Sequence, residues 1–195
     1  FPNILPPNEL VYQMDADTSQ RFYETLKQLT DGKSESNPDG KGLDYARYRA
    51  IEFLKPEYQG KYKNAEHIAQ TLAGIYRVHM VKRLESSFYA FKKSLATLLR
   101  ITNDMIKMFE EDKVIIAPDL NVKELQSKGM ELDQIIEYAV NKGYSEEDIV
   151  FKADAFKPNF VEMLHHDKNI LEYLNLEWQK ENDDPKFDKF HENLK

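Results

Sequence analysis

The sequence predicts a mainly α-helical protein, an elongated antiparallel bundle built around one long helix. Two long stretches place apolar residues at alternating spacings of four and three, the period of a helix with one buried face. Capping residues and prolines bound several shorter helices. Only one short run near the N-terminus alternates as a strand does. Helix packing, with one short extended strand added, is therefore expected to account for the fold.

Residues 1–16 form the segment with strand character. Three prolines in residues 1–7 stiffen the chain, and Leu10, Tyr12 and Met14 then alternate with their neighbours. A lone strand leaves its backbone groups without partners, so its partner strand is expected outside this chain. The first residue is not Met, which fits a segment of a larger protein.

Residues 17–195 are expected to form a single helical domain that opens with two shorter helices. Asp17 or Thr18 can cap the first helix. The Gly- and Ser-rich stretch at about 31–42 then breaks it and is predicted to be a flexible loop. A second helix, over about 43–54, ends before a proline.

The dominant element is a helix predicted from about 64 to 112, on the order of 70 Å long at 1.5 Å per residue if it is unbroken. Its second half carries a continuous apolar seam with coiled-coil-like spacing. The seam residues are Leu84, Phe88, Phe91, Leu95, Leu98, Thr102, Met105 and Phe109. A seam of this length requires a partner helix.

The partner is predicted near the C-terminus. Lys157-Pro158 opens a helix whose apolar stripe also alternates four and three, with Asp167 as its single polar interruption. This helix is expected to lie antiparallel to the long one. Shorter helices are expected over about 122–142 and about 185–194.

Composition excludes several classes of protein. The 195 residues include no cysteine, which removes disulfides and cysteine nucleophiles and fits a cytoplasmic location. Charged residues make up 31% of the chain and no stretch is apolar enough to cross a bilayer, so no membrane contact is expected. The net charge is −7, yet residues 1–100 carry +3 and residues 101–195 carry −10. The two halves are therefore expected to serve different electrostatic tasks.

The sequence contains no complete catalytic motif. It lacks the Gly-x-x-x-x-Gly-Lys-Ser/Thr loop that cradles phosphates and the Asp-Glu-x-x box that holds magnesium. Glu162 and His165 form one Glu-x-x-His pair, whereas a carboxylate-bridged metal bundle needs two. His165 and His166 are therefore interpreted as surface or boundary residues, and no metal or cofactor is expected in this chain.

Basic residues concentrate in the middle of the predicted long helix, where Glu85 is the single acid between Tyr76 and Arg100. They are Arg77, Lys82, Arg83, Lys92, Lys93 and Arg100. Such a patch is typical of phosphate contacts. Arg47 and Arg49, interleaved with tyrosines, add groups that could stack on a nucleic-acid strand. Two other interpretations stay open: these cations are only solvated, or the acidic C-terminal helices neutralise them.

The run Lys-Arg-Leu-Glu-Ser-Ser at 82–87, continued as Phe-Tyr-Ala-Phe at 88–91, resembles a motif of bacterial superfamily-two helicases of the Swi/Snf-like type. In those proteins the motif lies in a helical region between two RecA-like motor lobes. The stretches 1–12, 45–48 and 156–186 also contain pieces similar to that family, so the resemblance spans nearly the whole chain.

The resemblance implies that this chain is a helical segment of a DNA-dependent ATPase whose ATP and magnesium sites lie outside it. The motor lobes and double-stranded DNA are the implied partners, and residues 1–16 would lead out of the first lobe. The chemistry of the motif residues indicates a structural role. Leu84, Phe88 and Phe91 would fill the seam, Arg83 and Glu85 would pair with neighbouring elements, and Ser86-Ser87 would allow close helix approach.

Three functions follow from these observations. The first is an accessory helical domain that couples motor-lobe motion to DNA through positioning and phosphate contacts, without chemistry of its own. The alternative is a protein-interaction or scaffold module without nucleic-acid contact, which a residual exposed apolar stripe would favour. An independent helical-bundle enzyme is the third, and the lone Glu-x-x-His scarcely supports it.

Overall fold

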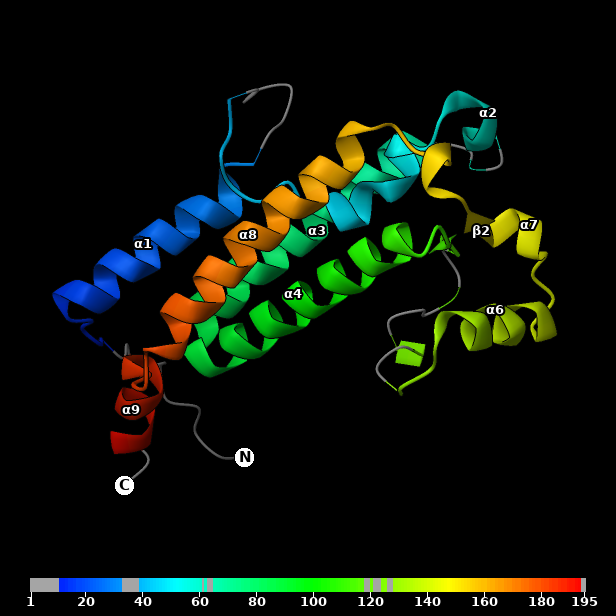
Figure 1. Cartoon of the computed structure of the whole chain (residues 1–195). Helices are drawn as coiled ribbons and strands as arrows, with labels where there is room; N and C mark the ends of the chain where they lie inside the picture. The colour runs from blue at the N-terminus through cyan, green and yellow to red at the C-terminus, as the bar shows by residue number, and fades with distance from the viewer. Residues whose placement is uncertain are drawn as a thin grey trace, which may run out of the picture.

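The computed structural model describes residues 11–32, 39–60, 62, 65–117, 120, 124–125 and 128–193. The protein is mainly α-helical, as the sequence predicts. Four long helices form its body (Figure 1): α1 (Ala16–Thr30), α3 (Ala65–Ser86), α4 (Phe88–Glu110) and α8 (Asn159–Gln179). Both α1 and α4 lie beside α3 and α8, and each helix runs antiparallel to its neighbours. No helix in the described ranges is long and apolar enough to cross a membrane.

The prediction of one unbroken helix over 64–112 is wrong, because the chain reverses direction at Ser87. Ser87 has an extended backbone, with φ −162° and ψ 129°, and its Oγ accepts a hydrogen bond from the backbone N–H of Ala90 (3.3 Å). A serine in this conformation caps the start of a helix, so α3 ends at Ser86 and α4 begins at Phe88. The two helices form an antiparallel pair, which we call the hairpin (Figure 1).

The predicted antiparallel pairing of the seam with the C-terminal helix is confirmed. Phe91, near the start of α4, meets Trp178 at the end of α8 edge to face, with ring centroids 5.2 Å apart. At the other end, Phe109 of α4 and Phe160 of α8 lie 5.5 Å apart. Every residue of the predicted seam is buried. Trp178 is fully buried and its indole N–H donates to Thr25 Oγ1 of α1 (2.9 Å), which joins α1 to the same core.

A smaller end unit covers the bundle where α4 ends and α8 begins (Figure 1). Its secondary structure comprises β1 (Val114–Ile115), α6 (Leu132–Asn141), α7 (Glu146–Ile149), β2 (Val150–Phe151) and the 3₁₀ helix η2 (Ala153–Ala155). β1 and β2 pair antiparallel, with Val114 opposite Phe151. The sequence did not predict this sheet, because two residues per strand are too few to show an alternating pattern.

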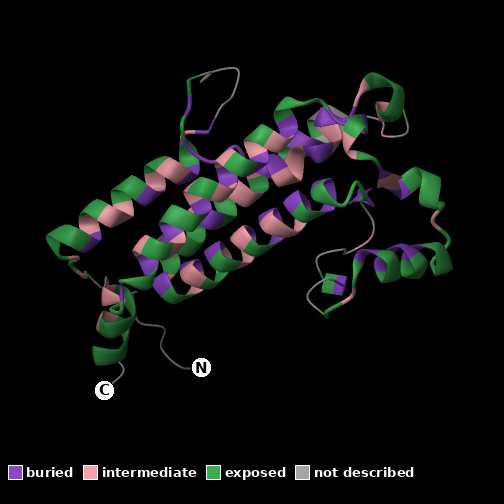
Figure 2. Ribbon diagram, in the orientation of Figure 1, coloured by how far each residue is buried: buried purple, intermediate pink, exposed green. Residues whose placement is uncertain are grey.

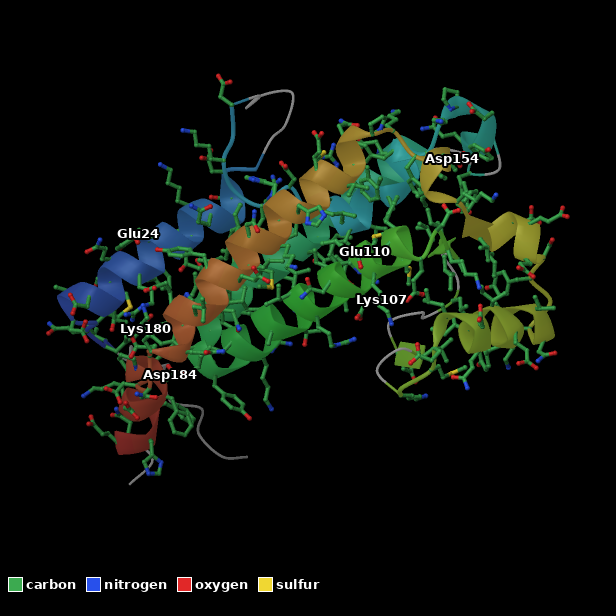
Figure 3. All side chains as sticks on the ribbon, viewed as in Figure 1. Glu24, Lys107, Glu110, Asp154, Lys180 and Asp184 are labelled. Carbon is green, nitrogen blue, oxygen red and sulfur yellow. The ribbon has the colours of Figure 1, made fainter. Side chains whose placement is uncertain are left out.

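The end unit has its own apolar core, which continues into the bundle. Phe160 stacks on both Phe53 and Phe156, with ring centroids 5.0 and 5.6 Å apart. Of the helix predicted over 122–142, α6 forms the second half, and residues 121–123 and 126–127 lie outside the described residues. Figure 3 shows Lys107 extending from α4 toward this unit, where its Nζ lies 3.9 Å from a Glu131 carboxylate oxygen.

The remaining elements are the 3₁₀ helix η1 (Ala46–Phe53), the short α2 (Pro56–Gln59) and the C-terminal α9 (Pro185–Glu192). The second helix, predicted over 43–54, is therefore a 3₁₀ helix that begins three residues later than expected. Figure 2 shows α9 almost entirely exposed, consistent with its lack of buried residues.

The N-terminal prediction is corrected in its described part. Residues 11–15 belong to no strand, and residues 1–10 lie outside the described residues. Asp15, rather than Asp17 or Thr18, caps α1: its Oδ1 accepts a hydrogen bond from the backbone N–H of Thr18 (2.7 Å). That hydrogen bond lowers the pKa of the Asp15 carboxyl.

The ends of the predicted flexible loop at 31–42 pack closely against the bundle. The backbone N–H of Gly42 donates to Asp31 O and that of Leu43 donates to Gln28 O, each at 2.8 Å. A Cβ on Gly32 would lie 2.1 Å from the Leu43 carbonyl oxygen, so only glycine fits there. Residues 33–38 lie outside the described residues, so the flexibility of the loop tip stays a prediction.

Candidate nucleic-acid interface

The turn of the hairpin is held by a carboxylate from a distant part of the chain. Asp184 Oδ2 accepts hydrogen bonds from the backbone N–H of Phe88 (2.9 Å) and from Ser87 Oγ (3.1 Å). Its Oδ1 accepts from the backbone N–H of Phe187 (3.3 Å), so one side chain caps both α4 and α9. Figure 3 shows Asp184 where α8 gives way to α9. Lys186 Nζ donates to Glu85 O (2.6 Å), where a cation also complements the C-terminal end of α3.

The motif residues that carry the family resemblance form this turn. Leu84, Phe88 and Phe91 are buried in the bundle core, and both phenylalanines contact Trp178. Ser86 and the Glu85 side chain are exposed, and Glu85 forms no ion pair with a described residue. Ser87 has a more specific role than allowing close helix approach, because it separates two helices.

A groove of about 230 Å³ runs along the hairpin between α3 and α4. Its lining residues are Tyr48 of η1, Tyr76, His79 and Met80 of α3, and Lys93, Ser94, Thr97, Leu98 and Ile101 of α4. We call this feature the groove. The rings of Tyr48 and Tyr76 stack with centroids 3.6 Å apart and an interplanar angle of 13°. Burial raises the pKa of the Tyr48 hydroxyl above its ordinary value.

Of the exposed cations on the hairpin, we call Lys82, Arg83 and Lys93 the hairpin cations. Arg83 Nε lies 3.5 Å from His79 Nε2 at the edge of the groove, and Lys93 lines the groove itself. Lys93 Nζ also lies 4.5 Å from the centroid of the Tyr89 ring. None of the three forms an ion pair with an acid among the described residues. Their charge therefore remains available to an anion.

Three other predicted cations of the hairpin have partners inside the fold. Arg100 forms an ion pair with Asp104 one turn later (2.9 Å). Lys92 Nζ donates to the backbone carbonyl of Glu181 (2.7 Å). Arg77 lies over the buried ring of Tyr45, 5.8 Å from its centroid. These contacts leave less of their charge for an outside phosphate.

The two arginines of η1 are also engaged internally. Arg49 forms a two-point pair with the Glu52 carboxylate, at 2.7 and 2.9 Å, and this hydrogen bonding raises the pKa of its guanidinium. The guanidinium of Arg47 is buried beside Met105, whose Sδ lies 3.9 Å from its Nη1, and desolvation lowers its pKa. Its Nε has no hydrogen-bond partner among the described residues. Neither side chain forms the exposed stacking surface that the interleaved tyrosines suggested.

Asp167, the polar interruption in α8, fixes the start of η1. Its two carboxylate oxygens accept hydrogen bonds from the backbone N–H groups of Asp44 and Ala46, each at 2.7 Å. Between them Tyr45 adopts a left-handed conformation with φ 54°, which is strained for a bulky residue. Burial raises the pKa of Asp167 to about 6. Asp167 is evident in the sequence as a break in an apolar stripe, whereas the two amides that it binds are not.

The histidines form no metal site in the part of the chain that the structure describes, where no group of three or more His, Asp or Glu side chains is placed to hold a metal ion. His165 is exposed, and His166 Nε2 lies 3.2 Å from the carbonyl oxygen of Gly42. His166 thus belongs to the boundary between α8 and the loop before η1.

Comparison of the chain with protein-family models, curated proteins and solved structures found no significant match. The resemblance to Swi/Snf-like helicases therefore stays a prediction.

Proposed function

We propose that this chain is an accessory helical domain of an ATP-driven DNA helicase or translocase and that the hairpin contacts DNA phosphates. The observation that supports this proposal is the set of hairpin cations, Lys82, Arg83 and Lys93, which are exposed on one helical pair without an acidic partner among the described residues. The domain has no chemistry of its own in this proposal. ATP and magnesium would bind in motor lobes outside this chain, as the family resemblance implies.

The mechanical part of the proposal follows from the stiffness of the hairpin. Its turn is a single residue, and Asp184 and Lys186 hold both sides of that turn. The first half of α4 packs on α8 through Phe88, Phe91 and Trp178. A displacement at the end unit would therefore move the hairpin cations as one body with the bundle, as a lever that positions DNA requires.

Fluorescence anisotropy with labelled duplex DNA at low salt tests the phosphate contacts. The variant Lys82→Gln, Arg83→Gln, Lys93→Gln removes three positive charges from the hairpin. We expect its affinity to fall by tenfold or more, and the slope of log affinity against log salt to lose about 0.9 per phosphate contact removed.

A matched control variant changes Lys113, Lys128 and Lys142 to Gln. These exposed lysines belong to or border the end unit, and their removal changes the net charge by the same amount. The proposal expects this variant to bind DNA within about twofold of the wild type. Equal losses of DNA affinity in both variants would show that affinity depends on net charge and not on the position of the cations. A folded wild type that binds no DNA would contradict the proposal.

A second function, binding of a protein partner, is favoured by a specific observation on α3. Leu72, Ile75 and Val78 lie at spacings of three on its outer side and are 38%, 56% and 53% exposed. An apolar stripe of this kind is typical of a helix that packs on another protein or on another domain of the parent. If this second function is correct, the wild type should bind no DNA, and changing all three residues to Ser should abolish association with purified motor lobes.

A further inference from the structure

The groove has features that phosphate contacts alone do not use. Its wall includes the stacked pair of Tyr48 and Tyr76, an aromatic surface that is already ordered before any ligand arrives. A volume of about 230 Å³ suits a small planar group rather than a second helix. Ordered aromatic rings bind such groups at a low cost in conformational entropy, because few side-chain rotamers are lost on binding.

Polar groups accompany the aromatic rings in the groove. Thr97 Oγ1 has no hydrogen-bond partner among the described residues, although Thr97 lines the groove. Ser94 Oγ donates to Ala90 O (3.0 Å) and keeps its lone pairs for an incoming donor. Hydroxyls of this kind can donate to or accept from the edge of any base, so they favour a base without selecting one.

Cations lie beside the groove rather than at its floor. Lys93 lines one side of it, and Arg83 adjoins His79 on the other. The single acid of the segment from Tyr76 to Arg100 is Glu85, which is exposed near the turn. The layout therefore places an apolar and hydroxyl-lined recess between positive charges, which matches a base between two backbone phosphates.

We propose that the groove binds one nucleobase of single-stranded DNA, stacked against the Tyr48–Tyr76 pair, while the neighbouring phosphates lie on Arg83 and Lys93. The inference rests on the proposed contact between the hairpin and DNA, and it specifies the class of DNA that is bound. A paired base is stacked on both faces and cannot enter such a recess unless it leaves the duplex. The protein therefore prefers single strands or the unpaired edge of a duplex.

Binding of a short oligo-dT strand and of an abasic strand with the same number of phosphates tests this inference. Both strands present the same charges, and only one presents bases. We expect the wild type to bind oligo-dT at least about fivefold more tightly than the abasic strand, since stacking of one base on an aromatic side chain is commonly that strong. The Lys82, Arg83 and Lys93 variant should lose affinity for both strands.

A variant that fills the recess gives the second readout. Thr97→Met places a larger side chain at the groove without removing a charge, and Ala96→Met adds comparable bulk at the exposed neighbouring position. Thr97→Met should bring oligo-dT down to the affinity of the abasic strand, whereas Ala96→Met should keep the wild-type ratio.

The outcomes separate this inference from the proposed function. Equal affinity of the wild type for both strands overturns the base-binding inference and leaves the phosphate contacts standing. An unchanged ratio in Thr97→Met overturns it as well, because the base would then bind elsewhere. Absence of binding to either strand removes the proposed function together with the inference.

Discussion

The η1 segment and the hairpin both combine cations with aromatic rings, yet the fold uses them differently. In η1, Arg49 is paired with Glu52 and Arg47 is buried beside Met105. On the hairpin, Lys82 and Lys93 remain exposed without an acidic partner among the described residues. The sequence pattern alone gives no reason to distinguish the two regions. Their difference shows that the supply of internal partners, rather than the number of cations, decides which charges can meet an outside anion.

The local chemistry explains why the two regions differ. η1 lies between α3 and α8, so its side chains are desolvated and need internal acceptors or apolar contacts. The hairpin cations are exposed on α3 and α4, where Glu85 is the single nearby acid in sequence and forms no ion pair with a described residue. Solvated cations keep their charge at little cost to stability.

The largest effect is expected at the residue that fixes η1. Asp167→Ala leaves the buried amides of Asp44 and Ala46 without their acceptor and should lower the free energy of unfolding by about 3 kcal/mol. Chemical denaturation followed by circular dichroism measures the loss. Glu162→Ala, at an exposed position of the same helix, serves as the control and should change stability by less than about 0.5 kcal/mol. A similar loss in both variants would show that the hydrogen bonds from Asp167 to η1 do not contribute specifically to stability.

A smaller loss is expected at the turn of the hairpin. Asp184→Ala removes the carboxylate that caps α4 and α9 and should lower the free energy of unfolding by about 2 kcal/mol. Asp188→Ala on exposed α9 provides the comparison, and it should stay close to the wild type. If Asp184→Ala leaves the free energy of unfolding unchanged, Ser87 alone is sufficient to maintain the turn between α3 and α4.

The pH dependence of stability tests the contribution of Asp167, the residue that fixes η1. The folded-state pKa of Asp167 is raised to about 6 because burial outweighs the hydrogen bonds from the Ala46 and Asp44 amides, which lower the pKa. The charge of Asp44 raises this pKa further, and that of His166 opposes the increase. The folded protein therefore binds this proton more tightly than the unfolded chain, and the contribution of Asp167 to stability increases as the pH falls. Between pH 7 and pH 5 the gain should be about 1 kcal/mol.

The difference between the wild type and Asp167→Asn isolates this gain from other titrating groups. Asn cannot ionise, so urea denaturation of the variant should lack the increment that the wild type gains on acidification. Parallel pH profiles for the two proteins would show that Asp167 has an ordinary pKa in the fold.

The smallest effects on stability concern charge removal itself, and the property that changes should differ between the two regions. Arg47→Met replaces a buried guanidinium whose Nε lacks a partner in the described part of the chain. The free energy of unfolding should therefore fall by no more than about 0.5 kcal/mol, and DNA affinity should not change. The hairpin variant with Lys82, Arg83 and Lys93 changed to Gln should be equally stable but bind DNA more weakly. A loss of DNA affinity in Arg47→Met, measured by anisotropy, would break the contrast.

Much of the helical architecture could be predicted from periodicity. The seam from Leu84 to Phe109 and the stripe from Phe160 to Trp178 are buried as their spacings indicated, and the two helices pair antiparallel. The reversal at Ser87 could not be found in this way. Leu84, Phe88 and Phe91 keep helical spacing across the break because both sides of the turn face the same core.

The interface was predictable in composition but not in detail. The cluster of basic residues between Tyr76 and Arg100 is evident in the sequence. The residues that bind some of these basic side chains, however, belong to distant segments of the chain. Lys92 bonds to Glu181, 89 residues later, and Asp167 bonds to amides 121 and 123 residues earlier. The groove was missed because it exists only where the hairpin folds back and Tyr48 is brought beside Tyr76.

Lysine acetylation, read by mass spectrometry with and without duplex DNA, tests most directly whether the hairpin is the region that meets DNA. Lys82 and Lys93 should react more slowly when DNA is present, while Lys113 and Lys128 should react at unchanged rates. Protection of Lys113 and Lys128, or no protection of Lys82 and Lys93 under conditions where DNA is bound, would contradict the account.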